Sequence, residues 1–143
     1  MIVRDHPEKT EIKDLLDRVL SVRPDDFPDI DRQVRTFGLF DTDLDGRLRA
    51  GSFVYLHPGW AYIDIVWVRE DCRGTGQGRA LVSQTEEEAV KRGAHSAYLW
   101  TQDFEAPGFY EKLGYKRFVV MEDFIPGHQR IGFMKKLMKG RAA

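Results

Sequence analysis

Apolar residues recur with two different periods along the chain, and these periods separate predicted helices from predicted strands. Steps of three and four residues predict a helix over about residues 8–21, with one buried stripe at Ile12, Leu15, Leu16, Val19 and Leu20. The same period over about residues 77–92 predicts a second helix, with an inward face of Leu81, Val82, Thr85 and Ala89. Pro107 and Gly114 bound a third, short helix.

Shorter apolar or alternating runs predict the strands. They lie at residues 34–40, 48–56, 60–68, 96–101, 115–124 and 131–138, after a short first strand at residues 1–4. A helix joins the third of these long runs to the fourth, so these two strands should be parallel. The order of elements predicts an α/β fold of the α+β kind, and 143 residues suffice for a single domain over residues 1–143.

The turn between the first two long runs has two interpretations. Its residues 41–46 match the opening of a calcium-binding EF-hand loop, Asp41-Thr42-Asp43-Leu44-Asp45-Gly46. The twelfth position, which needs a bidentate glutamate, is Ser52, and strands rather than helices flank the loop. Asp-Gly between two strand patterns instead indicates a β-hairpin. We adopt the hairpin and predict no metal site.

Composition narrows the range of partners. The formal net charge is −1, with 22 basic and 23 acidic residues, so the chain lacks the basic excess that nucleic-acid binding requires. No apolar run approaches the roughly 20 residues of a membrane helix, and no leader pattern opens the chain. Its single cysteine, Cys72, excludes an internal disulfide. We expect a cytoplasmic protein without nucleic-acid or membrane partners, and leave open whether it is a homodimer.

A glycine-rich turn joins the strand at 60–68 to the second helix. It reads Arg73-Gly74-Thr75-Gly76-Gln77-Gly78-Arg79. Glycines let a ligand approach the backbone and tolerate positive φ, so the N–H groups of such a turn can converge where the helix dipole is also positive. Arg73 and Arg79 add charge-assisted donors. The stretch therefore predicts a phosphate site.

The spacing of the turn identifies the class of phosphate ligand. A Rossmann fingerprint counted from Gly74 would need glycine at Arg79, and a Walker A loop would need a lysine that is absent between Val68 and Val90. The pattern Arg73-x-x-Gly76-x-Gly78 instead resembles the acetyl-CoA pyrophosphate loop of the GNAT superfamily of N-acyltransferases. A second stretch resembles that family's Phe-Tyr-x-x-x-Gly-Tyr signature, Phe109-Tyr110-Glu111-Lys112-Leu113-Gly114-Tyr115. The resemblance covers roughly residues 60–137.

The resemblance implies a fold and a cofactor site. The implied GNAT fold is a mixed, mostly antiparallel sheet of about six or seven strands, with a splayed parallel pair and helices on both faces. In this family the strand before the glycine turn bulges, and its unpaired backbone binds the pantetheine arm of acetyl-CoA. We assign that role to Val66, Trp67 and Val68. The implied pyrophosphate contacts come from Arg73, Gly74, Thr75, Gly76, Gln77, Gly78 and Arg79.

The resemblance also makes Tyr110 the general acid that protonates the departing thiolate. A tyrosine with a pKa of about 10 is a weaker acid than a thiol of about 8.5, so this transfer is uphill unless the tyrosine is perturbed. For the base we select Asp64, a carboxylate in an otherwise apolar strand, with Glu122 behind it. Burial would raise the pKa of Asp64 and make it a usable base or amine anchor. The alternative is an outward-facing structural acid.

Two other groups of polar residues bear on the substrate. Asp25, Asp26 and Asp29, in the loop after the first helix, either attract a cationic amine or form a solvated charge run. Gln102 and Asp103 follow the strand at 96–101 and face the cofactor cleft, because ligands bind at the carboxyl ends of parallel strands. The resembled family often carries an asparagine near this point, and we assign these two residues no role.

These observations predict an N-acetyltransferase. It would move the acetyl group from acetyl-CoA to a primary amine of a small molecule or peptide, by direct transfer in a ternary complex. One alternative is a non-catalytic domain of the same fold that binds acyl-CoA as a sensor. Another is a nucleotide-binding domain that uses the same loop.

Overall fold

The computed structural model describes residues 1–26 and 35–138, and these belong to two compact units divided between Ile30 and Asp31. The first unit contains α1 (Lys9–Ser21), whose start is closed by a capping box between Glu8 and Glu11. Its period was predicted correctly, and no residue of the helix is buried within its own unit. Burial of its apolar stripe stays a prediction. Residues 1–4 form no strand, which corrects the prediction there. A single domain over residues 1–143 stays a prediction.

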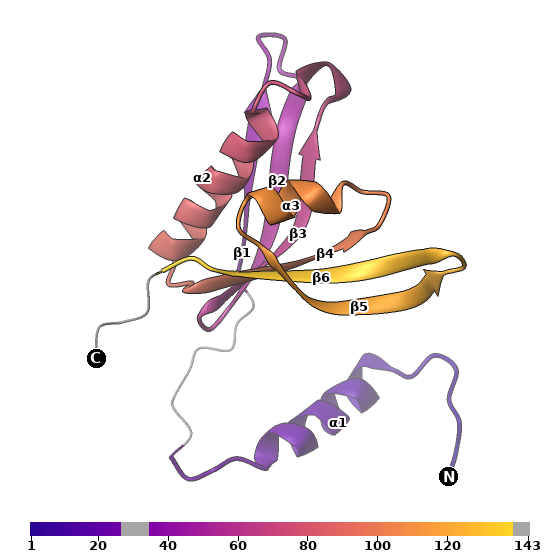
Figure 1. The fold of residues 1–143 in the computed structure, drawn as a ribbon. Helices are drawn as coiled ribbons and strands as arrows, with labels where there is room; N and C mark the ends of the chain where they lie inside the picture. The colour runs from indigo at the N-terminus through magenta and orange to yellow at the C-terminus, as the bar shows by residue number, and fades with distance from the viewer. Residues whose placement is uncertain (27–34, 139–143) are drawn as a thin grey trace. The chain divides into compact units, whose positions relative to one another are not determined.

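The second unit is built on a six-stranded sheet with the order β1-β2-β3-β4-β6-β5 (Figure 1). The strands are β1 (Arg35–Thr42), β2 (Leu48–His57), β3 (Trp60–Val68), β4 (Ser96–Gln102), β5 (Lys116–Ile125) and β6 (His128–Lys136). Only β3 and β4 pair in parallel among these neighbours, and all other pairs are antiparallel. The predicted mixed, mostly antiparallel sheet with one parallel pair is confirmed.

The turn between β1 and β2 is a hairpin, as its Asp-Gly sequence predicts. Gly46 adopts a positive φ of 78° there. The carboxylate of Asp43 accepts hydrogen bonds from the backbone N–H groups of Asp45 and Arg47, at 3.0 and 2.9 Å. Its other oxygen pairs with Arg69, 2.9 Å away, in the segment after β3. The aspartate therefore shapes the turn and ties it to the start of the glycine-rich loop.

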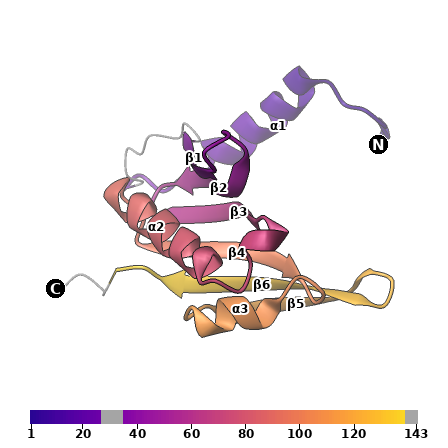
Figure 2. The same ribbon diagram turned by 90° about the horizontal axis from the view of Figure 1, so that it is seen from above.

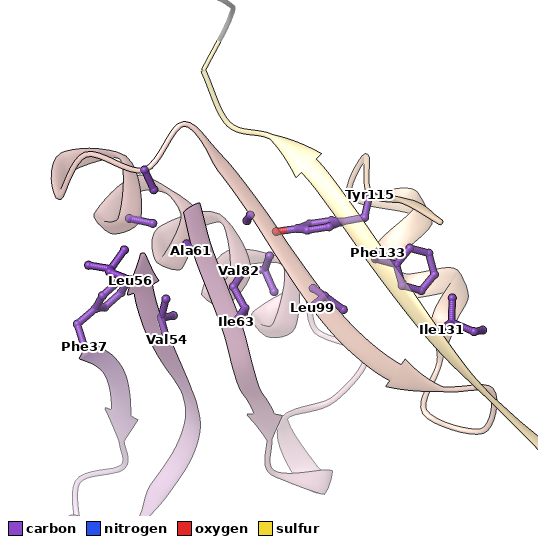
Figure 3. Packing of buried hydrophobic residues seen from close by; sticks show 13 residues of the cluster. Phe37, Val54, Leu56, Ala61, Ile63, Val82, Leu99, Tyr115, Ile131 and Phe133 are labelled. Carbon is purple, nitrogen blue, oxygen red and sulfur yellow. The ribbon is translucent and has the colours of Figure 1, made fainter. Parts of the chain in front are cut away.

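Two helices lie on one face of this sheet, α2 (Gln77–Lys91) and α3 (Pro107–Lys112) (Figure 2). The residues buried on α2 are those predicted: Leu81, Val82, Thr85 and Ala89. They pack on side chains from β2, β3, β4 and β6 that point to the same face, among them Val54, Ile63, Leu99 and Phe133 (Figure 3). A hydrogen bond of 2.7 Å between Ser52 and Thr85 satisfies two buried hydroxyls of this core.

The opposite face of the sheet carries a row of aromatic side chains. Phe53, Tyr55, Tyr62 and Tyr98 follow one another across β2, β3 and β4, with ring centroids 5.0, 6.0 and 4.9 Å apart. Alternation along each strand explains the division, because successive side chains point to opposite faces. The sheet therefore presents an aliphatic face to α2 and an aromatic face on its other side.

A polar network crosses the edge of the core. Glu86 on α2 accepts hydrogen bonds from the Tyr115 hydroxyl, at 2.9 Å, and from Nζ of Lys135 on β6, at 2.9 and 3.1 Å. The side chains of Lys135 and Glu86 are only 26% and 15% exposed. Because both charges are largely removed from water, the loss of either partner leaves the other poorly solvated.

We expect Glu86→Ala to lower the free energy of unfolding by about 2–3 kcal/mol, since it leaves the Lys135 ammonium and the Tyr115 hydroxyl without their acceptor. Urea unfolding followed by circular dichroism measures this change. Glu88→Ala is the matched control on the same helix. Its exposed pairs with Lys91 and Arg92 predict a loss within about 1 kcal/mol. Equal losses for the two variants would contradict the role assigned to Glu86.

Candidate active site

The two parallel strands separate soon after they begin. β3 and β4 pair only through Trp60–Tyr62 and Ser96–Tyr98. Beyond that point β3 stays paired with β2 as far as Val68, and β4 stays paired with β6 as far as Gln102. The register of β3 against β2 shifts at Asp64, which is the extra residue of a β-bulge. The carboxyl ends of β3 and β4 therefore open as a V, as the family resemblance implied.

The pairing of β3 with β2 shows which backbone groups face this opening. The N–H of Arg69, just after β3, donates to the Arg49 carbonyl at 2.7 Å. Hydrogen-bonded residues alternate along an antiparallel pair, so Trp67 and Ile65 are the preceding residues whose backbone groups point toward β2. The N–H and C=O groups of Val66 and Val68 consequently point away from β2, toward the side from which β4 has diverged. Of the three residues predicted to pair with pantetheine, these two have the required backbone direction. Trp67 offers its side chain, which is 40% exposed.

The glycine-rich loop leads from β3, through the 3₁₀ turn η1 (Glu70–Cys72), into α2. Gly74 and Gly76 have φ of 75° and 83°, and Gly76 is the N-cap of α2. The first N–H groups of α2 have no partner within the helix, so they are free to bind an anion. A Cβ at either glycine would meet no atom within 4 Å. The loop is therefore open on the side where a phosphate would approach.

The side chains of the loop have different partners. Arg73 Nε donates to the Val68 carbonyl at 2.9 Å, which places its guanidinium beside the end of β3. Arg79 is exposed, and it makes no hydrogen bond or ion pair within the described ranges. The side-chain amide of Gln77 is instead bound to Asp41 and Arg49 on the first two strands. Gln77 can therefore contribute its backbone N–H, whereas its side chain braces the loop.

The second motif lies directly against this loop. A Cβ placed on Gly78 would lie 3.4 Å from Cζ of Phe109 and 3.7 Å from a methyl group of Val68. Gly78 thus lets α3 approach the start of α2 and the end of β3. The structure brings together both motifs predicted from the sequence, although about thirty residues separate them along the chain.

Tyr110 is enclosed by aromatic rings. Its centroid lies 5.1 Å from Phe109, 5.9 Å from Tyr115 and 6.0 Å from Phe133. Burial, together with the nearby charge of Glu105, raises the pKa of Tyr110 to about 12. The shift opposes proton release, so the hydroxyl stays protonated at neutral pH and acts as a hydrogen-bond donor. Complete proton transfer to a free thiolate is even more uphill than for an unperturbed tyrosine.

Asp64 is an outward-facing acid, which is the second of the two interpretations that the sequence allowed. Its side chain is exposed on the aromatic face and accepts a hydrogen bond of 2.9 Å from the Tyr62 hydroxyl. The bulge turns it away from the core, so the burial considered in the first interpretation does not occur, and its role as base stays a prediction. Glu122, the second candidate base, is exposed on β5 and accepts a hydrogen bond from Gln129 Nε2 at 2.8 Å.

These elements match a known family over most of the chain. The model of the Acetyltransferase (GNAT) family matches residues 10–115, which include the glycine-rich loop and Tyr110. The chain belongs to the GNAT family. Its membership confirms the predicted superfamily, and the protein is an acyltransferase enzyme.

Two named acetyltransferases are similar to this chain in sequence. The chain is 30% identical over 97 residues to the blasticidin-S acetyltransferase of Streptomyces morookaense, across 67% of this chain and 71% of the relative. It is 34% identical over 73 residues to acetyltransferase Atu2258 of Agrobacterium fabrum, across 51% of this chain and 53% of the relative. The GNAT assignment therefore rests on sequence as well as on fold.

Solved structures of acetyltransferases have the same GNAT fold. A crystal structure of an acetyltransferase from Bacillus cereus superposes with a TM-score of 0.79 at 26% identity, covering 95% of this chain and 98% of the other. An aminoglycoside 6'-N-acetyltransferase complexed with coenzyme A has a TM-score of 0.65 at 20% identity, covering 73% and 74%. At that identity the second likeness concerns the fold alone.

Two residues near the V received no role from the sequence. The side-chain oxygen of Gln102, at the end of β4, is buried without a hydrogen-bond partner. Arg130 lies opposite it on β6. The position of Gln102 at the carboxyl end of a parallel strand was a usable signal, whereas nothing in the sequence around Arg130 singles it out.

No helix among the described residues is long and apolar enough to cross a membrane. In the same part of the chain, no group of three or more His, Cys, Asp or Glu side chains is arranged to hold a metal ion. Cys72 is partly exposed, and its thiol donates to Asp71 at 3.4 Å.

Proposed function

We propose that this GNAT enzyme is an N-acetyltransferase that moves the acetyl group of acetyl-CoA directly to a primary amine. The observation that carries the proposal is the meeting of three elements at one end of the sheet: the open glycine loop, the splayed end of β3 and the partly buried Tyr110. Acetyl-CoA is the donor expected of the family. The acceptor is a small molecule or the amine of a peptide.

The cofactor end of the site would fix the position of the thioester. The N–H groups of Gly76, Gln77 and Gly78, with Arg73 and Arg79, would bind the pyrophosphate. The backbone of Val66 and Val68 would pair with the amides of pantetheine, as an added strand pairs with a sheet edge. Binding energy from these remote contacts then holds the reacting carbonyl in place.

The transfer itself forms one bond and breaks another. The nitrogen of the neutral amine attacks the thioester carbonyl carbon, and a backbone N–H near Val68 stabilises the oxyanion. Collapse of the tetrahedral intermediate breaks the carbon–sulfur bond and releases the thiolate of coenzyme A. Tyr110 donates a hydrogen bond to that sulfur. The proton lost by the amine leaves toward Asp64 or water, and a proton from solvent completes the free thiol.

Two measurements test this function. Isothermal calorimetry should detect binding of coenzyme A and acetyl-CoA, and neither should be displaced by ATP. Release of free thiol from acetyl-CoA, followed against a panel of primary amines, should show acyl transfer. Binding without transfer to any amine would instead favour the acyl-CoA sensor, and displacement by ATP would favour a nucleotide site.

A further inference from the structure

The splayed end of the sheet has a second cluster of functional groups, on the face away from α2 and α3. We define the Arg130 cluster as Trp100 and Gln102 on β4, Phe124 on β5 and Arg130 on β6. Gln102 and Arg130 are direct cross-strand partners, so their side chains share a face with Cβ atoms about 4.5–5.5 Å apart. Trp100 precedes Gln102 by two positions and points the same way. The cluster therefore borders the V from the side opposite to the pyrophosphate loop.

Gln102 carries an unmet hydrogen-bonding requirement. Its backbone N–H donates to a carboxylate oxygen of Glu105 at 3.1 Å, yet its side-chain oxygen is buried without any partner in the described ranges. Burial of an amide oxygen without a donor is unfavourable, and most such atoms in folded proteins are satisfied. A ligand with an N–H group would supply the missing donor. In this position that donor can be the amine of the acceptor.

Arg130 has aromatic neighbours, and no acidic partner among the residues that the structure describes. Its guanidinium lies 4.8 Å from the centroid of Trp100 and 4.7 Å from that of Phe124. Neither a hydrogen bond nor an ion pair of this side chain occurs within residues 1–26 and 35–138. Stacking uses the faces of a guanidinium and leaves its in-plane N–H donors available. Those donors match a carboxylate in a bidentate arrangement.

The other side of the V supplies a complementary negative charge. Asp64 is exposed on β3 and is oriented by the Tyr62 hydroxyl. Burial and the bonded Asp64 raise the pKa of Tyr62 to about 12, while the charge of Arg130 acts in the opposite sense. Arg130 is thus electrostatically coupled to this pair across the opening. Arg130 is the direct strand partner of Gln102, and Asp64 lies on the strand that diverges from β4, so this face of the sheet carries one cationic and one anionic group beside the V.

We propose that the acceptor is a zwitterionic, amino-acid-like amine, whose carboxylate binds Arg130 and whose nitrogen binds at Gln102 and Asp64. The proposal rests on the proposed acetyltransferase function and names the substrate class of that site. It differs from the expectation based on the acidic loop, which favours a purely cationic amine. Asp25 and Asp26 of that loop belong to the other unit, and Asp29 lies outside the described residues.

Matched pairs of acceptors test the carboxylate requirement directly. Each pair is an amino acid and the amine that lacks its carboxylate: alanine with ethylamine, phenylalanine with 2-phenylethylamine, and lysine with 1,5-diaminopentane. With acetyl-CoA as donor, we expect kcat/KM to favour the amino acid in at least one pair by roughly 10-fold or more. Arg130→Gln should lower kcat/KM for that amino acid roughly 10- to 100-fold and change the value for its partner amine by less than about threefold.

Two further variants separate charge from folding. Arg130→Lys keeps the positive charge without the bidentate geometry, so its kcat/KM for the amino acid should lie between the values of the wild type and Arg130→Gln. Arg92→Gln is the matched control, because Arg92 also stacks on an aromatic ring, Phe37 at 4.9 Å, but lies at the far end of α2 and already pairs with Glu88. We expect this control to retain the wild-type preference.

A binding measurement distinguishes failure of the inference from failure of the proposed function. Saturation-transfer NMR with each pair, in the presence of coenzyme A, reports acceptor binding without turnover. Selective binding of the amino acid that is lost in Arg130→Gln supports the inference even if no acyl transfer occurs. A wild-type preference for the amines, equal losses for both members of a pair, or no binding of any amino acid would overturn it.

Discussion

Tyr110→Phe is expected to lower kcat roughly 100- to 1,000-fold while leaving the affinity for acetyl-CoA unchanged. The substitution keeps the ring that packs against Phe109, Tyr115 and Phe133 and removes only the hydroxyl. The proposed mechanism uses that hydroxyl only when the thiolate departs, so the loss should fall on kcat and kcat/KM rather than on cofactor binding. Steady-state kinetics with the preferred amine, together with calorimetry, measures both quantities.

The pH dependence sharpens this prediction. Because burial raises the pKa of Tyr110 to about 12, the protonated donor is present throughout a practical assay range, and it is lost only as the pH rises through that value. We therefore expect the ratio of wild-type to Tyr110→Phe activity to stay constant from about pH 6 to pH 10. Tyr55→Phe is the control, since the Tyr55 ring stacks on Tyr62 on the far face of the sheet. Full turnover of Tyr110→Phe at every pH would remove the tyrosine from the mechanism.

Gly76→Ala should weaken acetyl-CoA binding roughly 10- to 100-fold, the equivalent of about one charge-assisted hydrogen bond. Gly76 has a φ of 83°, which costs an L-residue roughly 1–2 kcal/mol, so the loop either carries strain or turns its N–H groups away. The added Cβ also enters the open space where the pyrophosphate is proposed to lie. Calorimetric titration with coenzyme A measures the change.

Gly93→Ala controls for the backbone strain. Gly93 has a φ of 97° at the opposite end of α2, and a Cβ there also meets no atom within 4 Å. Both variants should lose a similar free energy of unfolding, and only Gly76→Ala should lose affinity. If both bind coenzyme A equally well, the glycine-rich loop is not the pyrophosphate site.

The sequence was most informative where local chemistry determines structure. The limits of β3 and the buried face of α2 were correct because their apolar periods match the sheet and helix geometry that buries them. The start of β6 was missed, because His128, Gln129 and Arg130 are polar and are held in the strand by ladders to β4 and β5. Arg130 consequently lay just before the predicted strand at 131–138 and was not considered as a binding residue.

Features that depend on distant partners could not be predicted. The side chain of Gln77 is bound by Asp41 and Arg49, which lie far earlier in the chain. The sequence around Gln77 therefore does not show that this side chain braces the loop instead of binding the ligand. The pKa of Tyr110 depends on burial by Phe133 and on the charge of Glu105. The apolar stripe of α1 correctly indicated a helix, but its period carries no information about what surrounds that helix.

The bulge in β3 has a genetic consequence. Asp64 and Ile65 are consecutive exposed residues, and the extra residue restores Val66 and Val68 to the face occupied by α2. An in-frame deletion of one codon at this point would leave the length of β3 almost unchanged. It would also keep the inward face, because loss of the extra residue returns the strand to plain alternation, with Ile63 and both valines still inward and Trp67 still outward. Deletion of Asp64 would therefore remove the bulge and the carboxylate without exposing the side of β3 that packs under α2.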